Sequence, residues 1–302
     1  QGGWETSFQS FRKLFWKIAL LAFPGVLITA WLFSVFAVGA GEMLGIVVPV
    51  TVAVLLGAVL ASTDPAAIIP LLQPLRFRKN TAKDIVISES AMNDFVGALL
   101  TIVLLGFVKL AGGSFSSIHE GFASLFSVSS GTVLLKQMLF GIMFGVLGYF
   151  LLQFLSKHKQ DHDEEYGADA AFLLFVPVIA FTGALLIGGS GYLAAFVAGL
   201  LFSASDRLRH TEHFYNQTID GFAKPVIFLL LGALVDVQSL IAYAPIGLLM
   251  AVLFMFVIRP FVVFTMLGLF LKMGKERLSL KELFFISWVR ETGAIPAVLL
   301  VT

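Results

Sequence analysis

Long apolar segments are the feature of this sequence that most restricts its fold. A helix needs about 20 predominantly apolar residues to cross the hydrocarbon core of a bilayer. Nine segments of the 302-residue chain meet or approach that length: 14–38, 43–73, 84–110, 131–156, 168–188, 190–205, 221–240, 243–271 and 281–302. The pattern predicts an all-α polytopic membrane protein with about nine spans.

Composition leads to the same class of protein. The chain is 58% hydrophobic and 13% charged, with a mean hydropathy of +0.94, whereas a soluble domain is roughly a quarter charged. The net charge of +1 gives no electrostatic basis for binding nucleic acid. The absence of cysteine excludes disulfides, thiol catalysis and cysteine metal sites. Because the chain starts Gln1-Gly2-Gly3 and stops inside an apolar run, we expect a fragment of a longer protein, or one with trimmed termini.

The basic residues test this division into spans. All but four of the 20 Lys and Arg lie at the start of the first segment or in every second connection, and the intervening connections contain none. Cytoplasmic loops of membrane proteins are enriched in Lys and Arg. We therefore predict that the first span starts in the cytoplasm, and that loops 74–83, 157–167, 205–220 and 272–281 are cytoplasmic.

The four remaining basic residues fall within the apolar segments. Lys109 and Lys136 lie near segment ends, where a long side chain can reach the membrane interface. Arg259 and Arg290 lie well inside their segments. We expect both of these arginines to have buried partners.

The second segment contains an acid followed by a proline, Asp64-Pro65. Proline lacks an N–H group and its ring clashes with the carbonyl four residues earlier, so we expect the helix to break here. Inside a membrane, a break is tolerated only where it is buried in protein or lines a cavity. The free carbonyls at such a break can form an ion site near the membrane midplane. The alternative is that Asp64 only caps the second half-helix.

The third segment contains Glu89-Ser90 and Asn93-Asp94. Asp94 lies about 15 Å along a helix that begins near residue 84, close to the middle of a core about 30 Å thick. Ser90 and Asp94 share one helical face, and Glu89 and Asn93 share the next. Burial favours a protonated Asp94 and a bound cation favours its carboxylate, so proton and cation would compete for it. The alternative is a static pair of Asp94 with one of the buried arginines.

Together these motifs resemble those of the monovalent cation/proton antiporters of the NhaP and NHE type, the CPA1 group. Thr63-Asp64-Pro65 matches the broken-helix motif of that family, and Glu89-Ser90 with Asn93-Asp94 matches its ES…ND motif. The similarity covers nearly the whole chain and includes 191–200, 225–228, Arg259-Pro260 and 293–296. It implies the antiporter fold, with inverted repeats and two crossed, broken helices at Pro65 and Pro296. It also implies that the first helices and the last are missing from this sequence.

The resemblance implies a role for each matching residue of the ion site. Asp94 would bind cation and proton in turn. Asp64, Ser90 and the carbonyl of Thr63 would complete the site for the monovalent cation. Asn93, also assigned to this site, stands where electrogenic relatives have a second aspartate, so exchange is expected to be electroneutral.

The resemblance also assigns two buried arginines. Glu89 is expected to pair with Arg259 and to hold the core together without transporting anything. Arg290 is displaced from the family's common position directly before a glycine, and is expected only as a positive charge near the site. Gln1 stands where the family often has an acid that contributes to the ion site.

The function implied by the resemblance is secondary antiport of Na⁺, K⁺ or Li⁺ against H⁺ by alternating access. We expect residues 1–302 to form a single transmembrane transporter domain, in a homodimer in the plasma membrane, with no cofactor and no enzymatic activity. One alternative is a K⁺-efflux system or gated cation channel, which would favour a nucleotide-binding regulatory domain. Another is an intramembrane enzyme using Asp64 and Asp94 as an acid/base dyad, but the surrounding oxygen donors favour cation binding.

Overall fold

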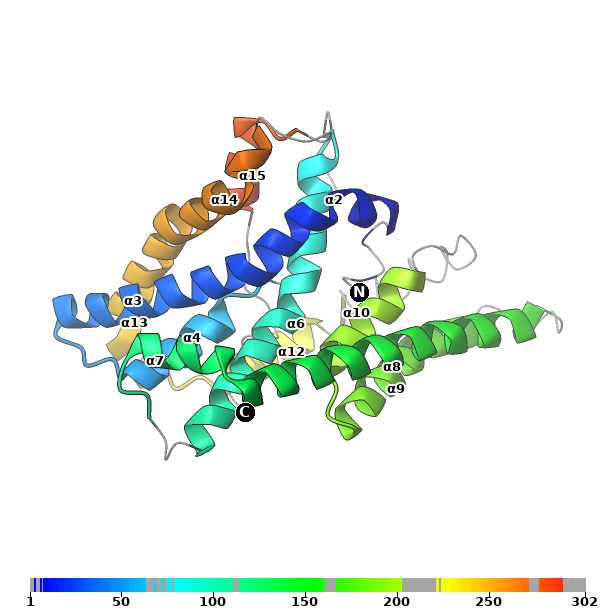
Figure 1. Ribbon diagram of the computed structural model, residues 1–302, viewed down its shortest axis with the longest axis horizontal. Coiled ribbons are helices and arrows are strands. Elements are labelled where there is room, and N and C mark those ends of the chain that lie inside the picture. The colour runs from blue at the N-terminus through cyan, green and yellow to red at the C-terminus, as the bar shows by residue number, and fades with distance from the viewer. Residues whose placement is uncertain are drawn as a thin grey trace. The chain divides into compact units, whose positions relative to one another are not determined.

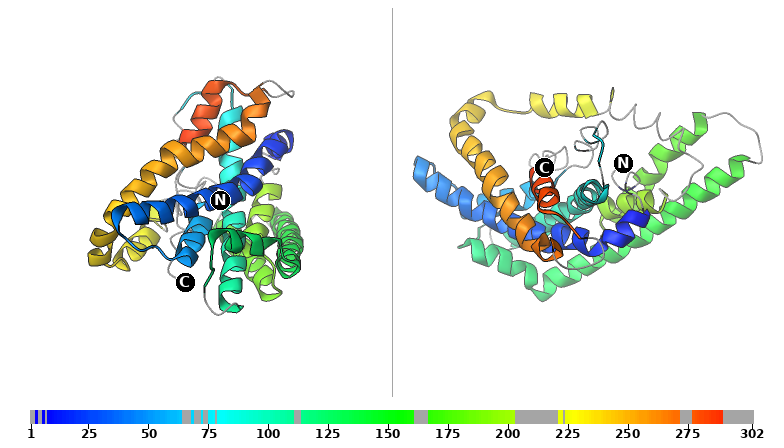
Figure 2. Two further views of the ribbon diagram at one scale, coloured as in Figure 1. Left: turned by 60° about the vertical axis from the view of Figure 1, so that its left-hand side comes forward. Right: turned by 90° about the horizontal axis from the view of Figure 1, so that it is seen from above.

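The computed structural model describes residues 3, 6, 8–63, 68, 72, 75–77, 79–110, 114–160, 167–202, 221–222, 224–271 and 277–289. Within these ranges all regular structure is helical (Figures 1 and 2), which confirms the all-α prediction. Four described helices are long and apolar enough to cross a membrane, namely Phe8–Leu44, Thr81–Lys109, Val128–Leu155 and Val237–Leu271, and three apolar helices are shorter. The count of nine spans stays a prediction, because parts of several segments lie outside the described residues.

The chain divides into two compact units, and each is described by itself. The first consists of residues 1–10 and 135–233, and the second of residues 11–134 and 234–302. The first unit contains most of α8 (Val128–Gln160), together with α9 (Gly167–Leu186), α10 (Gly191–Phe202) and α12 (Lys224–Ala233).

Small residues bring the helices of the first unit close together. A Cβ atom on Gly145 of α8 would lie 2.6 Å from the Cβ of Val197 on α10. Ala180, Ala184 and Ala194 form a buried cluster between α9 and α10. Small residues of this kind let helices of membrane proteins approach closely.

The second unit starts with a long helical rod and a shorter helix packed against it. The rod consists of α2 (Phe8–Leu20), the π-helical turn η1 (Leu21–Gly25) and α3 (Val26–Leu44), and α4 (Val50–Leu60) lies antiparallel to α3 (Figure 1). Gly57 of α4 faces the Ala30 backbone, where a Cβ atom would clash. Ser34 donates a hydrogen bond to the Ala53 carbonyl at 3.0 Å. The two helices are therefore in backbone contact.

The helix α6 (Thr81–Leu110) forms the centre of the second unit. All of its residues from 85 to 101 are buried, and it packs against η1, α4 and α15 (Leu280–Trp288). The last long span of this unit consists of α13 (Val237–Leu253), the π-helical turn η5 (Phe254–Ile258), α14 (Arg259–Leu267) and the 3₁₀ turn η6 (Gly268–Leu271). Most of α13 is exposed, whereas α14 buries Arg259, Val262, Val263 and Leu267.

Two boundaries differ from the sequence prediction. The first span continues to Leu44, so the connection predicted at 39–42 is wrong. It ends where Gly45 adopts a left-handed conformation with φ of 69° and Ile46 donates to the Gly41 carbonyl at 2.8 Å.

The division between the seventh and eighth segments is also wrong. The connection predicted near 238–243, where the segments 221–240 and 243–271 meet, lies inside α13, and the break falls at 234–236. Asp236 caps α13 by accepting hydrogen bonds from the Ser239 hydroxyl at 2.6 Å and the Ser239 N–H at 3.0 Å. These bonds hold the pKa of Asp236 below its usual range. At three of the loops predicted to be cytoplasmic, α6 starts at residue 81, α8 extends to 160 and α15 starts at 280, so the helices extend into the predicted loops.

We predict that a single methyl group at Gly57 destabilises the α3–α4 pair. The added Cβ would meet the carbonyl oxygen of Ala30, and a backbone atom can yield only if the helices separate. We expect Gly57→Ala to cost about 1–3 kcal/mol and to lower the thermal unfolding midpoint in detergent. Gly39→Ala on α3 is the matched control, since nothing lies within 4 Å of its added Cβ. Equal midpoints for the two variants would contradict the close packing.

Candidate functional site

The site forms where α4 ends and the chain continues without helical structure beside α6. The helix α4 stops at Leu60, and Ser62 and Thr63 are non-helical and buried. A backbone that leaves a helix inside the protein exposes N–H and carbonyl groups that must find partners. The Thr63 N–H donates to the side-chain oxygen of Asn93 on α6 at 2.9 Å.

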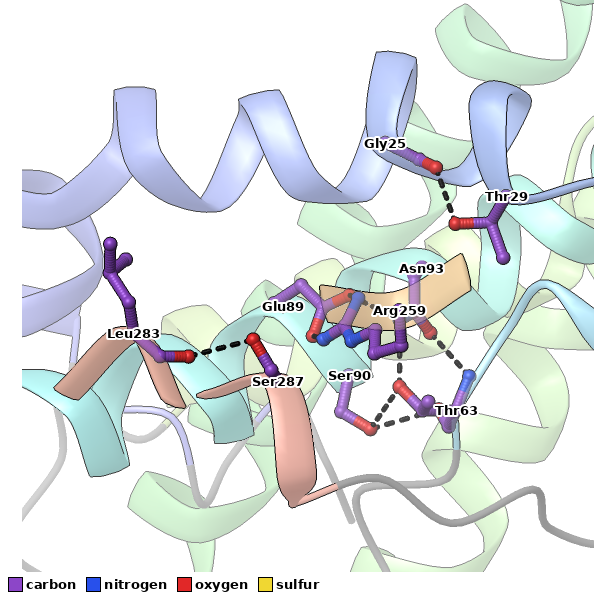
Figure 3. Close-up of polar contacts among 9 residues, drawn as sticks. All are labelled: Gly25, Thr29, Thr63, Glu89, Ser90, Asn93, Arg259, Leu283 and Ser287. Atoms are coloured by element: carbon purple, nitrogen blue, oxygen red, sulfur yellow. Dashed lines mark hydrogen bonds and ion pairs between the residues drawn. The ribbon is translucent and has the colours of Figure 1, made fainter. Parts of the chain in front are cut away.

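Ser90 meets both oxygens of Thr63 (Figure 3). Its hydroxyl oxygen lies 2.9 Å from the Thr63 carbonyl oxygen and 2.9 Å from the Thr63 hydroxyl oxygen. A hydroxyl has one hydrogen, so Ser90 donates to one of these oxygens at a time. The carbonyl keeps a second lone pair in either case. These three oxygen atoms form a small polar group between α6 and the non-helical segment.

Asn93 links this group to a buried ion pair (Figure 3). Its side-chain NH₂ donates to the Thr63 hydroxyl at 2.7 Å and to a carboxylate oxygen of Glu89 at 2.8 Å. The orientation of the amide follows from its partners, because its oxygen faces an N–H and its nitrogen faces a carboxylate. Asn93 therefore joins α6 to Thr63 through its oxygen and one amide hydrogen, and its other amide hydrogen binds Glu89 on the same helix.

Glu89 and Arg259 form a two-point ion pair between α6 and α14. The Arg259 Nη2–Glu89 Oε2 distance is 2.9 Å and the Nη1–Oε1 distance is 3.3 Å. The side chains of Arg259 and Glu89 are only 3% and 2% exposed, respectively. Two parallel charge-assisted hydrogen bonds fix both distance and orientation. The pair thus ties two distant parts of the sequence together at the level of Thr63.

Asp94 follows Asn93 on α6 and lies one helical turn beyond Ser90. Its exposed fraction is 8%. Carbonyl, hydroxyl and carboxylate oxygens are the ligands that hard cations prefer. No group of three or more His, Cys, Asp or Glu that could hold a metal ion occurs among the described residues. The Thr63 carbonyl, the Thr63 hydroxyl and the Ser90 hydroxyl are neutral oxygen donors, which suits a cation of low charge.

The structure brings together five of the residues that the sequence singled out: Thr63, Glu89, Ser90, Asn93 and Arg259. It places Asp94 on the same helix. Four other predicted residues, Asp64, Pro65, Arg290 and Pro296, lie outside the described residues.

Two features of this site were missed by sequence reasoning. The spacing of Glu89 and Asn93 placed them on one helical face, but the bonds from Asn93 to Thr63 depend on how α6 meets the end of α4. The close contact of Gly97 with Ser62 was missed for the same reason. The available signal was a glycine one turn after Asn93 in a helix that must approach a broken segment.

A cavity of about 910 Å³ also lies in the second unit, among α3, α4, α13 and α15. Arg259 and Ser287 contribute to its lining, but most of its described lining is apolar. The Ser287 hydroxyl donates to the Leu283 carbonyl of its own helix (Figure 3). The cavity lacks the cluster of oxygen donors found around Thr63, so we do not assign the cation to it.

Comparison with known proteins gives consistent results. The whole chain, residues 1–302, matches the family model described as "Sodium/hydrogen exchanger, transmembrane". The K(+)/H(+) antiporter NhaP2 of Shewanella oneidensis is 27% identical over 303 residues, covering 99% of this chain and 48% of that protein. The K(+)/H(+) antiporter NhaP of Alkalimonas amylolytica is 32% identical over 306 residues, covering 99% and 48%. The chain thus spans about half the length of these curated relatives.

A similar protein of known structure is the sodium proton antiporter MjNhaP1 from Methanocaldococcus jannaschii at pH 8. It superposes with a TM-score of 0.69 at 26% sequence identity, covering 100% of this chain and 71% of that chain. The likeness confirms the antiporter fold expected from the motifs. The crossing of two broken helices stays a prediction, because Pro65 and Pro296 lie outside the described residues. The chain is therefore a multi-pass membrane protein that belongs to the transmembrane sodium/hydrogen exchanger family, a family of transporters and not of enzymes, and it is of the CPA1 type.

Proposed function

We propose that this protein is a secondary antiporter that exchanges a monovalent cation for H⁺ by alternating access. The observation that carries the proposal is the buried group of Thr63 and Ser90 oxygens beside a helix that also contains Asp94. A buried ionisable residue within a membrane-spanning helix carries a high free-energy cost, so it is by default a functional-site candidate. The curated relatives are named K(+)/H(+) and Na(+)/H(+) antiporters, which supports the same function.

In this proposal Asp94 is the group that binds cation and proton in turn. The cation is held by the Asp94 carboxylate, the Thr63 carbonyl and the Ser90 hydroxyl, with Asp64 as a further ligand. In this structure the Ser90 hydroxyl donates its hydrogen to the Thr63 carbonyl. A cation held by both of these oxygens would require that hydrogen to turn away from the carbonyl. When the cation leaves, protonation removes the buried charge of Asp94. The carboxylate is thereby neutralised at each stage of the cycle.

Asn93 serves the site as a link rather than as a carrier of charge. Its amide is engaged by Thr63 and Glu89, and an amide cannot take up a proton in the exchange. One carboxylate therefore handles one cation or one proton, and we propose electroneutral, one-for-one exchange. Arg290 would add a fixed positive charge near the site, and Pro65 and Pro296 would break the two crossing helices.

The Glu89–Arg259 pair would hold α6 and α14 together throughout the cycle. Its two-point geometry suits a structural role better than a transport role, because a proton or cation bound at Glu89 would have to displace Arg259. We propose further that the protein is a homodimer in the plasma membrane, in which residues 1–302 act as one transporter domain. The loops 74–83, 157–167, 205–220 and 272–281 would face the cytoplasm, and the exchange would contribute to pH homeostasis.

The first test of this function is the variant Asp94→Asn. Asparagine resembles the protonated acid in shape but cannot release a proton, so we expect exchange to fall to the level of protein-free liposomes. The measurement is cation-driven dequenching of a pH-sensitive dye, with Na⁺, K⁺ or Li⁺, on the full-length protein in proteoliposomes. Asp84→Asn, the same change in the first turn of α6, is the control and should retain exchange. Native exchange by Asp94→Asn would overturn the mechanism.

The second test separates the ion pair from the transport chemistry. Removing one partner of a buried pair costs about 3–5 kcal/mol, whereas replacing both with neutral groups of similar volume can be nearly neutral. We therefore expect Glu89→Gln and Arg259→Met to lower the thermal unfolding midpoint singly. The double variant should recover much of the loss and should still exchange cations for protons. A purely structural role would be contradicted if the two decreases in unfolding midpoint simply added in the double variant. It would also be contradicted if the double variant were stable but did not exchange cations for protons.

A further inference from the structure

Gly97 lies on α6 one turn beyond Asn93, on the face that meets the non-helical end of α4. A Cβ atom added to it would lie 2.8 Å from the Ser62 Cβ and 3.1 Å from the Ser62 Oγ. The optimal separation of two carbon atoms is about 3.5–4.0 Å. Even alanine at this position would therefore overlap Ser62. The contact exists only because residue 97 has no side chain.

The overlap cannot be relieved by turning the Ser62 side chain. A Cβ atom is bonded directly to the backbone, so it moves only if the backbone of Ser62 moves. Ser62 directly precedes Thr63, whose N–H and carbonyl are both bonded to α6 at 2.9 Å. A displacement at Ser62 is thus passed on to the two Thr63 groups that meet Asn93 and Ser90.

We propose that Gly97 is a positioning residue of the cation site. Its missing side chain lets α6 approach Ser62 closely enough for the Thr63 N–H and carbonyl to bond to Asn93 and Ser90, which directly precede Asp94 and lie one turn before it, respectively. The role depends on the contact with Ser62 and is not a general property of glycines in this helix. Gly106, also on α6, has nothing within 4 Å of the position of an added Cβ. The inference rests on the proposed cation/proton exchange and adds a residue that contacts neither ion.

The test compares four variants of the full-length protein in proteoliposomes: Gly97→Ala, Gly106→Ala, Ser62→Gly and the double variant Ser62→Gly/Gly97→Ala. The quantities measured are the amount of folded protein and the dependence of the exchange rate on cation concentration. A misplacement of about 1 Å at a reacting group can lower a reaction rate about a hundredfold. For the smaller shift expected here, we predict that the apparent KM of Gly97→Ala for the cation rises about tenfold. The maximal rate should change less, because Asp94 itself is intact.

Gly106→Ala should have the native KM. The double variant should return towards the KM of Ser62→Gly, because removing the Ser62 side chain makes room for the new methyl group. If Gly97→Ala yields no folded protein, recovery of folded and exchanging protein in the double variant supports the same role. A native KM in Gly97→Ala, or a double variant no better than Gly97→Ala, would overturn the inference. Absence of exchange in the native protein would instead overturn the proposed function.

Discussion

The buried pair of Glu89 and Arg259 is the interaction on which the arrangement of the second unit depends. Taking two charges out of water costs several kcal/mol per ion, and only good geometry and further hydrogen bonds recover that cost. Here the guanidinium binds both carboxylate oxygens, and Asn93 donates a third bond to Glu89. Because Asn93 also holds Thr63, the same network fixes the end of α4. One connected group of polar contacts thus holds the end of α4 against α6, and α6 against α14.

This network also explains why a helix can end inside the apolar part of the protein. Thr63 is buried and non-helical, and backbone polar groups are expensive to bury without hydrogen bonds. Asn93 and Ser90 supply partners for its N–H and its carbonyl. The Thr63 carbonyl partner is a hydroxyl, which can rotate, whereas the N–H partner is a side chain fixed at three points. The rigid contact and the adaptable contact therefore lie on either side of the Thr63 Cα, in two successive peptide units.

Much of the fold followed from the sequence, and the errors have a common cause. Apolar length and the alternation of basic residues located α6, α8, α9 and α10 within a few residues. The boundaries near Gly45 and Asp236 were misplaced because the end of a helix is set by local hydrogen bonds, and apolarity alone does not locate these. In the site, the helical spacing of α6 predicted which side chains share a face. The contacts of Asn93 with Thr63 and of Gly97 with Ser62 depend on how two helices pack together, and the residue pattern of a single helix does not contain that information.

The π-helical turn η5 determines the rotational phase of the last long span. A π-helical turn contains one residue more than an α-helical turn, and successive residues of an α-helix are about 100° apart around the axis. The mostly exposed helix α13 and the helix α14, one face of which is buried, are joined at this turn, directly before Arg259. A residue gained or lost within α13 can be absorbed by forming or removing such a bulge. A residue gained or lost between Arg259 and Leu267 would instead rotate the rest of the buried face away from η1 and α15, against which α14 packs, so tolerance to insertions should change abruptly at η5.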